Sequence, residues 1–263
     1  LEEVLARADI DVVDICLPPS LHVPAVRATL ESGKHAVCEK PLAASLADVD
    51  GIAELALRTG RTVCPVFQYR FGNGLRKLWR LVEAGVPGRP LVATVETHWD
   101  RGPDYYRVPW HGRKDGELGG ALVSHAIHAH DLLTEVLGPV RRVQALVATR
   151  VNCIETEDCA AACLEMADGT LVTLSVTLGS AEEITRLRFC YAHLTVESSL
   201  NAYRPATDPW RFVPRDPGTA AEVKRQLEGF QPGPEGFQGL FAELADGLDA
   251  GEDPPVTIAD ARR

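Results

Sequence analysis

Residues 38–43 read Cys-Glu-Lys-Pro-Leu-Ala, and this stretch decides how the chain is interpreted. It closes an apolar run over 35–38 that predicts a short buried strand. Proline pushes the residue before it towards extended geometry, so Lys40 is expected to point outward from the strand end. An ammonium there could hydrogen-bond a substrate oxygen and stabilise negative charge developing on it. The alternative is a solvated lysine at the end of a strand.

Strand and helix patterns alternate around this stretch. Apolar runs at 12–17 and 62–67 predict two more strands, while 23–32 has helical spacing. Ser45 begins a capping-box pattern for a helix through Arg58. Strands separated by single helices form right-handed crossovers and therefore a parallel sheet. Residues 1–68 are therefore predicted to form an α/β domain with a parallel sheet.

Ligands of such sheets bind beyond the carboxyl ends of the strands. Three segments lie at those ends in this chain: residues 17–22, Glu39-Lys40, and Gln68 with the two residues after it. Polar groups are therefore expected to gather along one edge of the sheet. This is the arrangement of a binding site.

The pattern changes after residue 68. A helix is expected near 72–84, and most later segments read as strands, at 90–99, 142–151, 158–167, 170–178, 185–191 and 193–198. One long helix is predicted from Gly120 to about Leu137, and 201–219 is expected to be a loop. Residues 69–263 are thus predicted to form an α+β domain with a mostly antiparallel sheet.

The predicted helix after Gly120 contains three histidines. Ser124, His128 and Asp131 are spaced to share one helix face, with His125 nearby. One reading is that these histidines are hydrogen-bonded core residues. Another is a metal-dependent hydrolase that uses His125, His128 and His130, but ligands two residues apart suit a strand better than a helix. A metal site is therefore not expected.

Composition excludes several classes of protein. The formal net charge is -10, with no run of lysines and arginines, so a nucleic-acid partner is not expected. No apolar run approaches the roughly 18 residues that a membrane span needs. The seven cysteines form no C-x-x-C pair, which favours free thiols and a reducing, cytoplasmic location.

The glycine-rich dinucleotide fingerprint G-x-G-x-x-G is absent. Its nearest imitation is Gly72-Asn73-Gly74, where Lys77 stands in place of the third glycine, so a helix start is the better interpretation. The chain opens at Leu1 in what reads as the tail of a helix. It closes with Thr257 as the cap of a helix that has only begun. We therefore expect a chain truncated at both ends.

Three motifs together resemble one family of enzymes. They are D-V-V-D-I-C-L-P-P-S-L-H at 11–22, C-E-K-P-L-A at 38–43 and G-G-A-L-x-x-x-x-I-H-x-x-D at 119–131. They are similar to the NAD(P)-dependent oxidoreductases of the glucose–fructose oxidoreductase/inositol dehydrogenase (Gfo/Idh/MocA) family. In that family a Rossmann domain precedes a mostly antiparallel substrate domain.

The resemblance implies roles for particular residues. Lys40 and His128 match the catalytic lysine and histidine of the family. The residues implied to approach the NAD or NADP cofactor are Leu17, Pro18, Pro19, His22, Glu39, Lys40 and Gln68. The first strand, the glycine loop and the ribose-binding acidic residue would precede Leu1.

One departure from the family bears on mechanism. Family members often carry an aspartate four residues before the histidine, and here that position is Ser124. A carboxylate would hold the imidazole tautomer and raise its pKa, whereas a hydroxyl can only hydrogen-bond. We expect either His125 or a substrate group to take over that task.

The segment 101–113 is expected to be the substrate loop. Aromatic rings stack on sugar faces, and arginine forks hold carboxylates or phosphates. The expected substrate residues are His98, Tyr106, Trp110, Arg113, Ser124 and His125. The alternative is that the loop packs its aromatic rings against its own domain.

The sequence therefore predicts hydride transfer between a nicotinamide and a carbinol or carbonyl carbon of a sugar-like or polyol metabolite. His128 would act as general acid/base, and Lys40 would stabilise the reacting oxygen. A rival is a non-catalytic sensor of the same fold that binds dinucleotide and sugar. A homo-oligomer formed through the sheet of the second domain is also expected.

Overall fold

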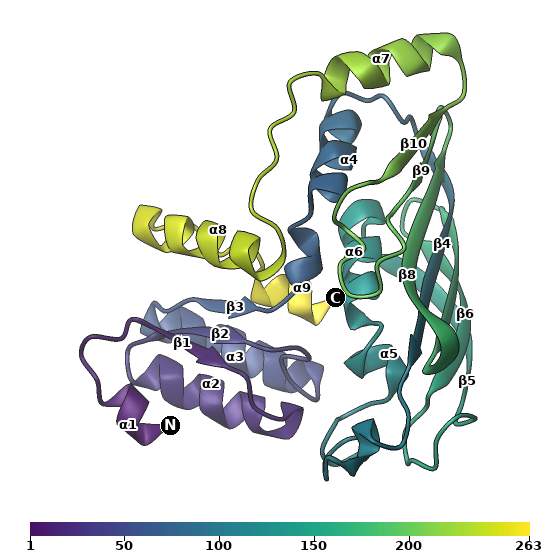
Figure 1. Ribbon diagram of the computed structural model, residues 1–263. Coiled ribbons are helices and arrows are strands. Elements are labelled where there is room, and N and C mark those ends of the chain that lie inside the picture. The colour runs from purple at the N-terminus through teal and green to yellow at the C-terminus, as the bar shows by residue number, and fades with distance from the viewer.

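A three-stranded parallel sheet forms the N-terminal part of the molecule (Figure 1). Its order is β1 (Val12–Ile15), β2 (His35–Cys38) and β3 (Val63–Pro65). The computed structural model describes all residues, 1–263. Helices α2 (His22–Glu31) and α3 (Leu46–Thr59) make the two crossovers. The predicted parallel sheet is confirmed, and all three carboxyl ends lie at one edge.

The ends of α3 follow the local rules that the sequence indicated. The Ser45 hydroxyl accepts a hydrogen bond from the Asp48 N–H at 3.2 Å, which satisfies one free donor of the first turn. Gly60 ends the helix with φ of 62°, in the left-handed region that glycine enters without a steric penalty.

The two faces of this sheet are covered by different parts of the chain. Side chains that alternate along β2 separate the two cores: Ala36 and Cys38 pack with α2 and α3, whereas Val37 packs with Leu240 and Leu244. The latter two belong to α8 (Gly236–Ala250), which lies across the sheet from α2 and α3 (Figure 1). The chain therefore returns to its N-terminal half after building the second sheet.

The division expected at residue 68 needs correcting for this return. Both α8 and α9 (Ile258–Arg262) pack on the N-terminal sheet rather than on the second one (Figure 1). Their apolar residues complete a core around Val66 and Phe67 that residues 1–68 cannot close alone. Sequence order alone did not indicate this, because both helices follow the last strand of the other sheet.

The second sheet has seven strands in the order β10-β9-β8-β4-β7-β6-β5, and only the β4–β7 pair is parallel. The strands are β4 (Pro90–Asp100), β5 (Val140–Ala148), β6 (Cys159–Met166), β7 (Leu171–Thr177), β8 (Gly179–Tyr191), β9 (Leu194–Glu197) and β10 (Arg211–Pro214). The mostly antiparallel sheet predicted for this region is confirmed. No helix is long and apolar enough to cross a membrane.

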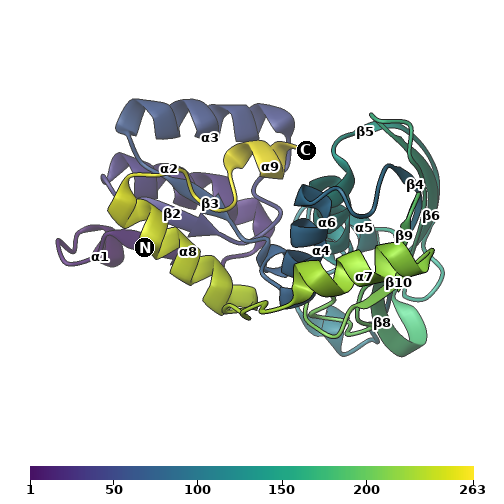
Figure 2. The ribbon, with the colours of Figure 1, turned by 90° about the horizontal axis from the view of Figure 1, so that it is seen from above.

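Helices cover one face of this large sheet. They are α4 (Asn73–Glu83), α5 (Ala121–Ser124) and α6 (Ile127–Leu137), while α7 (Pro217–Leu227) packs on α4 and β10. The short α1 (Glu2–Leu5) begins the chain. On the inner face, Val95 and Leu187 are fully buried against α4 and α6. The other face carries no helix (Figure 2).

Two predicted elements differ from the structure. The helix expected from Gly120 to Leu137 is interrupted at His125 and Ala126, giving the separate helices α5 and α6. The segment 201–219, expected to be a loop, contains β10 and the start of α7. Its proline and aspartate content hid both, although Asp216 and Pro217 form an ordinary helix start in which Asp216 accepts from the Thr219 N–H.

The glycine pair that imitates a dinucleotide fingerprint has a packing role. A side chain at Gly72 would meet the Ala206 carbonyl at 2.3 Å, and one at Gly74 would meet the Trp210 ring at 2.2 Å. Residues 201–210 can therefore lie directly on the start of α4 only because these positions have no side chain. The interpretation as a helix start agrees with α4, which begins at Asn73.

Arg70 ties three parts of the molecule together. It lies in the short 3-10 helix Gln68–Arg70 that follows β3, and its side chain is 9% exposed. Its guanidinium donates two hydrogen bonds to Asp131 of α6, at 2.6 and 2.8 Å. It also pairs with Glu135 at 3.0 Å and with Asp260 of α9 at 3.4 Å. The parallel sheet, the helix that carries His128 and the C-terminal helix thus share one cation.

We predict that Arg70→Met lowers the free energy of unfolding by about 3 kcal/mol, because it leaves a buried carboxylate without its partner. Urea denaturation followed by circular dichroism measures this. Arg262→Met is the control, since Arg262 and Asp50 form a pair in which each side chain is 51% exposed. That change should cost less than about 1 kcal/mol. Equal losses in both variants would contradict the prediction.

Candidate active site

A cavity of about 630 Å³ opens where the N-terminal sheet meets the second domain. It is bounded by the ends of β2 and β3, by α5 and α6, by residues 203–207 and by the start of α8. The residues that line it are Lys40, Gln68, Tyr69, Phe71, Trp99, Ser124, His128, Tyr203, Arg204, Ala206, Thr207, Glu235, Gly236, Phe237 and Gln238. Its size is that of a typical small-molecule site.

Lys40 enters this cavity from the end of β2. Its Nζ donates a hydrogen bond to the Ser124 carbonyl oxygen at 2.5 Å, across the boundary between the two sheets. An ammonium has three donors, so two remain for a ligand. Burial lowers the pKa of Lys40, and the charges of Glu39 and Glu117 oppose that shift. The Lys40–Pro41 peptide bond is cis.

His128 enters from the first turn of α6. Its ring is 5% exposed and packs at 4.6 Å on the ring of Tyr69, with Phe67 edge-on at 6.0 Å. Its Nδ1 has no hydrogen-bond partner in the chain. Burial, with a smaller contribution from the charge of Lys40, holds the pKa of His128 well below its usual range. The imidazole is therefore neutral near pH 7 and can accept a proton.

The segment before His128 is fixed by close backbone contacts. The Ala121 N–H donates to the Glu157 carbonyl at 2.8 Å, and the Leu122 N–H donates to the Glu157 carboxylate at 3.1 Å. A side chain at Gly120 would come within 2.1 Å of that same carbonyl. Glycine is therefore required where this segment crosses Glu157, and the contact sets the position of Ser124 in the cavity wall.

The residues expected to approach the cofactor fall into two groups. Gln68 lines the cavity, and its Oε1 is buried without a hydrogen-bond partner, which fits a ligand group that donates a hydrogen bond. Glu39 is partly buried beside Lys40, and burial raises its pKa. Leu17 and Pro18 are at least partly exposed beyond the end of β1. These groups fit a dinucleotide lying along the strand ends.

His22 and Pro19 do not have the expected role. Both are buried, and both ring nitrogens of His22 lie 2.8 Å from carbonyl oxygens, one of Leu17 and one of Pro41. The imidazole is thus enclosed and fully occupied in joining the chain segments after β1 and β2. His22 shapes the site by holding these segments in place, and no ring atom is left to meet a ligand.

The structure corrects the position of His98. Successive residues of a strand face opposite sides of the sheet, and His98 lies on the helix-free face, 2.8 Å from the Ser175 hydroxyl. Trp99, the next residue, is the one that lines the cavity. A strict count of the alternation over 90–99 would have selected Trp99.

The loop at 101–113 packs mainly on its own domain. Arg113 is half-exposed and pairs with Asp115 at 3.0 Å, outside the cavity. Trp110 lies over Gly116, and Tyr106 lies beside Gly112, where an added side chain would meet its ring at 3.0 Å. None of the three expected residues of this loop reaches the cavity, because each is used to fold the loop back on itself.

His125 lies directly behind the cavity wall. It is 5% exposed, with the ring of Trp99 edge-on at 5.7 Å and that of Tyr105 at 5.5 Å. Burial lowers the pKa of His125 to about 3, with smaller contributions from Lys40 and Arg101. Neither ring nitrogen has a partner in the chain. Ser124, by contrast, lines the cavity as expected.

Sequence reasoning missed the far wall of the cavity. Tyr203, Arg204 and Thr207 come from the segment expected to be a featureless loop, and Gln238 comes from the first turn of α8. No motif marks these positions. They reach the site only because residues 201–210 lie on Gly72 and Gly74 and because α8 returns to the first sheet.

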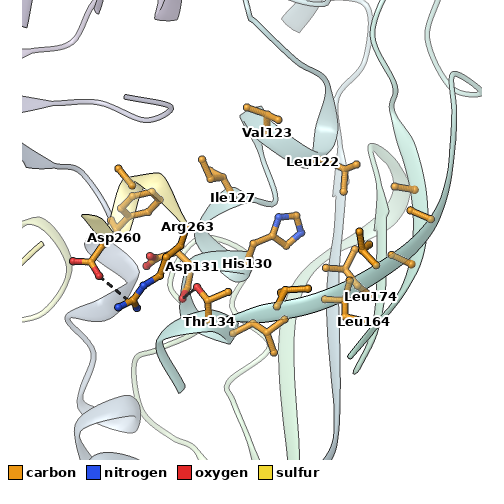
Figure 3. A pocket seen from close by; sticks show the side chains of 18 residues that line it. Leu122, Val123, Ile127, His130, Asp131, Thr134, Leu164, Leu174, Asp260 and Arg263 are labelled. Atoms are coloured by element: carbon orange, nitrogen blue, oxygen red, sulfur yellow. Dashed lines mark hydrogen bonds and ion pairs between the residues drawn. The ribbon is translucent and has the colours of Figure 1, made fainter. Parts of the chain in front are cut away.

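A second hollow, of about 420 Å³, lies on the other side of α6 (Figure 3). Its lining is mainly apolar, from Leu122 and Ile127 to Leu164 and Leu174. His130 points into it, whereas His128 lines the cavity of about 630 Å³. The histidines at 125, 128 and 130 therefore do not converge, and no group of three or more His, Cys, Asp or Glu side chains could hold a metal ion. The arrangement required by the hydrolase alternative is absent.

A partial Rossmann sheet, an antiparallel substrate-type sheet and a lysine–histidine pair between them define a class of two-domain oxidoreductase folds. Residues 1–67 match the model of an oxidoreductase family described by its NAD-binding Rossmann fold. Residues 75–193 match the C-terminal domain model of the same GFO/IDH/MocA family. The chain belongs to the Gfo/Idh/MocA family.

Curated relatives agree with this assignment. The chain is 30% identical over 138 residues to myo-inositol 2-dehydrogenase of Thermotoga maritima, covering 52% of this chain and 39% of the relative. It is 30% identical over 229 residues to dTDP-3,4-didehydro-2,6-dideoxy-alpha-D-glucose 3-reductase of Streptomyces violaceoruber, covering 84% and 64%. The chain thus spans only part of the length of these relatives.

Solved structures share the fold. The WlbA dehydrogenase from Bordetella pertussis, in complex with NADH and UDP-GlcNAcA, superposes with a TM-score of 0.83 at 24% identity, covering 99% of this chain and 76% of that one. A levoglucosan dehydrogenase in complex with NADH superposes with a TM-score of 0.80 at 21% identity, with the same coverages. At these identities the likeness concerns the fold alone.

We predict that Ser124→Asp raises the pKa of His128, because a carboxylate in the cavity wall stabilises the imidazolium. Asparagine has nearly the same shape as aspartate without the charge, so Ser124→Asn should leave the pKa of His128 unchanged. Titration of the histidine ring signals by NMR measures both, with His128→Gln used to assign the signal. An unchanged His128 in the aspartate variant would contradict the prediction.

Proposed function

We propose that the protein is an NAD(P)-dependent oxidoreductase acting on a CH–OH group of a sugar-like or polyol metabolite. The observation that carries this proposal is the meeting of Lys40 and His128 in one cavity. They come from different parts of the chain, 88 residues apart in number, and the Lys40–Ser124 hydrogen bond holds the two walls together. A carbinol between them would meet an acid/base group and a cation at once.

The roles of the two residues follow from their environments. His128 is buried and neutral, so it takes the hydroxyl proton in oxidation and returns it in reduction. The two free donors of Lys40 bind the same oxygen and stabilise the negative charge that develops there. When bound, the nicotinamide accepts or donates the hydride. Trp99 and Tyr69 exclude water from the wall around this point.

The proposed cofactor is NAD or NADP. The match of residues 1–67 to an NAD-binding Rossmann family supports it, as do solved relatives that contain NADH. Within this chain, Glu39 and the orphaned Oε1 of Gln68 would face the nicotinamide end, near Lys40. Leu17 and Pro18 would lie along the more distant part of the dinucleotide.

Relatives support a sugar-type substrate. Curated relatives are named for inositol, levoglucosan or a dTDP-deoxysugar, and two solved WlbA dehydrogenases contain UDP-GlcNAcA. The wall formed by Trp99 and Tyr203 offers aromatic faces of the kind that pack on sugar rings. All seven cysteines are free, which supports the proposal of a reducing compartment such as the cytoplasm.

We predict that Lys40→Met and His128→Gln each lower kcat/KM by about 10²–10⁴-fold, because each removes a group that acts on the reacting oxygen. The assay follows reduced nicotinamide by absorbance over a panel of polyols and sugars, in the protein as its gene encodes it. His98→Gln, on the helix-free face, is the matched control and should keep normal turnover. Near-normal rates in both site variants would refute the assigned roles.

A non-catalytic sensor is the second candidate, and Ser124 in place of the family's aspartate favours it. A sensor would bind dinucleotide and sugar and yet give no absorbance change with any substrate in the panel. Binding measured by calorimetry beside the kinetic assay separates the two. If the natural chain gave no turnover and the Ser124→Asp variant did, the result would favour the sensor.

We also propose a homo-oligomer formed through the helix-free face of the seven-stranded sheet. Val92, Leu146 and Leu171 lie on that face and are 45%, 82% and 57% exposed. A charge placed there should oppose association. We therefore predict that Leu146→Glu shifts the protein to monomer in analytical ultracentrifugation, while Leu57→Glu, on an exposed turn of α3, does not. A natural chain that is monomeric throughout would contradict this.

A further inference from the structure

The cavity contains a second cation, Arg204, that the proposed reaction does not use. Arg204 lines the cavity together with Lys40 and His128, and it is exposed to solvent. Its hydrogen bonds within the chain are made by its backbone, and its guanidinium forms no hydrogen bond or ion pair. We propose that Arg204 binds an anionic substituent, a carboxylate or a phosphoryl group, on a part of the substrate away from the reacting carbon. This proposal rests on the proposed function, because it names the substrate class for the same site.

The backbone around Arg204 is held in a fixed turn. The Asn201 carboxamide oxygen accepts hydrogen bonds from the N–H groups of Tyr203 and Arg204, both at 3.1 Å. The Thr207 hydroxyl donates to the Arg204 carbonyl at 2.8 Å. A turn closed from both sides in this way presents its side chain without first having to be ordered by a ligand.

Hydrogen bonds anchor this turn to β8, to Tyr69 and to α4. The Ala202 carbonyl accepts from the Thr185 hydroxyl of β8 at 2.6 Å and from the Tyr69 hydroxyl at 3.2 Å. The Ala206 carbonyl accepts from the Leu75 N–H of α4 at 3.2 Å. Tyr69 is also the ring on which His128 packs, so the position of Arg204 is tied to that of the catalytic histidine.

The charges around the cavity leave Arg204 without a partner. The only carboxylate in the lining is Glu235, whose Oε1 accepts from the Asn73 N–H at 2.7 Å at the start of α4. The nearby Arg101 is neutralised by Glu183 at 2.8 Å. Lys40 is occupied in part by the Ser124 carbonyl. The cavity therefore carries unpaired positive charge in a chain whose formal net charge is -10.

Arg204 is exposed to solvent, and what sets it apart is that it also lines the cavity that contains Lys40 and His128. A planar guanidinium binds carboxylate or phosphate oxygens with two parallel hydrogen bonds, and this geometry gives specificity as well as affinity. Thr207 and Gln238 line the same cavity and add neutral hydrogen-bonding groups. A cavity of about 630 Å³ accommodates a sugar ring with an acidic substituent. Such a substrate would reach from Lys40 and His128 to Arg204.

The test compares three probes that share one ring: glucose, glucuronate and glucose 6-phosphate. We expect Arg204→Gln to weaken binding of at least one anionic probe by about 10–100-fold, the value of a charge-assisted hydrogen-bonded pair. Binding of glucose should not change. Calorimetry on the protein as its gene encodes it, with reduced dinucleotide present, gives the dissociation constants. The two anionic probes separate a carboxylate from a phosphoryl preference.

Two further variants sharpen the result. Arg204→Lys keeps the positive charge but not the planar guanidinium, so it should retain part of the anion preference. Its affinity for the anionic probe should lie between the affinities of the natural chain and of Arg204→Gln. Arg89→Gln removes an exposed arginine outside the cavity and should change nothing. With any substrate that is turned over, Arg204→Gln should raise KM and leave kcat nearly unchanged.

Several outcomes would overturn the proposal. They are equal binding of glucose and the anionic probes, an equal loss for all three in Arg204→Gln, or no measurable binding of either anion. Because binding is measured without turnover, an inactive protein that still shows the Arg204-dependent preference would refute the proposed reaction and leave this inference standing. Turnover of neutral sugars with no anion preference would support the proposed reaction and refute the role of Arg204.

Discussion

The hydrogen bond from the Lys40 ammonium to the Ser124 carbonyl is the contact on which the site depends. It joins the end of a parallel strand to the segment just before α6, at 2.5 Å, and so closes the floor of the cavity. The ion pairs of Arg70 with Asp131 and Asp260 hold α6 and α9 against the end of β3. Together these contacts hold the two sheets so that one lysine and one histidine line a single cavity.

The environment of this contact explains how a serine can stand where the family often has an aspartate. Position 124 carries no carboxylate that could stabilise an imidazolium, and burial together with the charge of Lys40 lowers the pKa of His128. The histidine is then a neutral base over a wide range of pH. Its orientation comes from packing on Tyr69 and Phe67 rather than from a hydrogen-bonded acid. Ring contacts thus replace the positioning that a carboxylate would give.

The parts of the structure that follow from local rules could be predicted from the sequence. The alternation of strands and helices up to residue 68, the Ser45 cap and the mostly antiparallel second sheet all depend on short-range patterns. The lysine and histidine could be selected because each sits in a motif. The break between α5 and α6 could not, because no local pattern marks it, and the Ser124 carbonyl beside it accepts a hydrogen bond from Lys40, which lies 84 residues earlier in the chain. The return of α8 and the far cavity wall were hidden for the same reason: both are set by tertiary packing.

The predicted substrate residues differ most from the residues that line the cavity in the structure. Residue type suggested Tyr106, Trp110 and Arg113, yet a loop rich in aromatic and charged groups can satisfy them internally, and this one does. Trp99 and Arg204 are less conspicuous in the sequence, but both line the cavity. The Trp99 ring donates to the Thr185 hydroxyl, and the backbone of Arg204 is held in its turn by Asn201 and Thr207. What marks a binding residue here is a rigid backbone combined with polar atoms that the chain itself leaves unused. Gln68 and Arg204 both line the cavity and meet that condition, and a substrate and its cofactor would have to satisfy them.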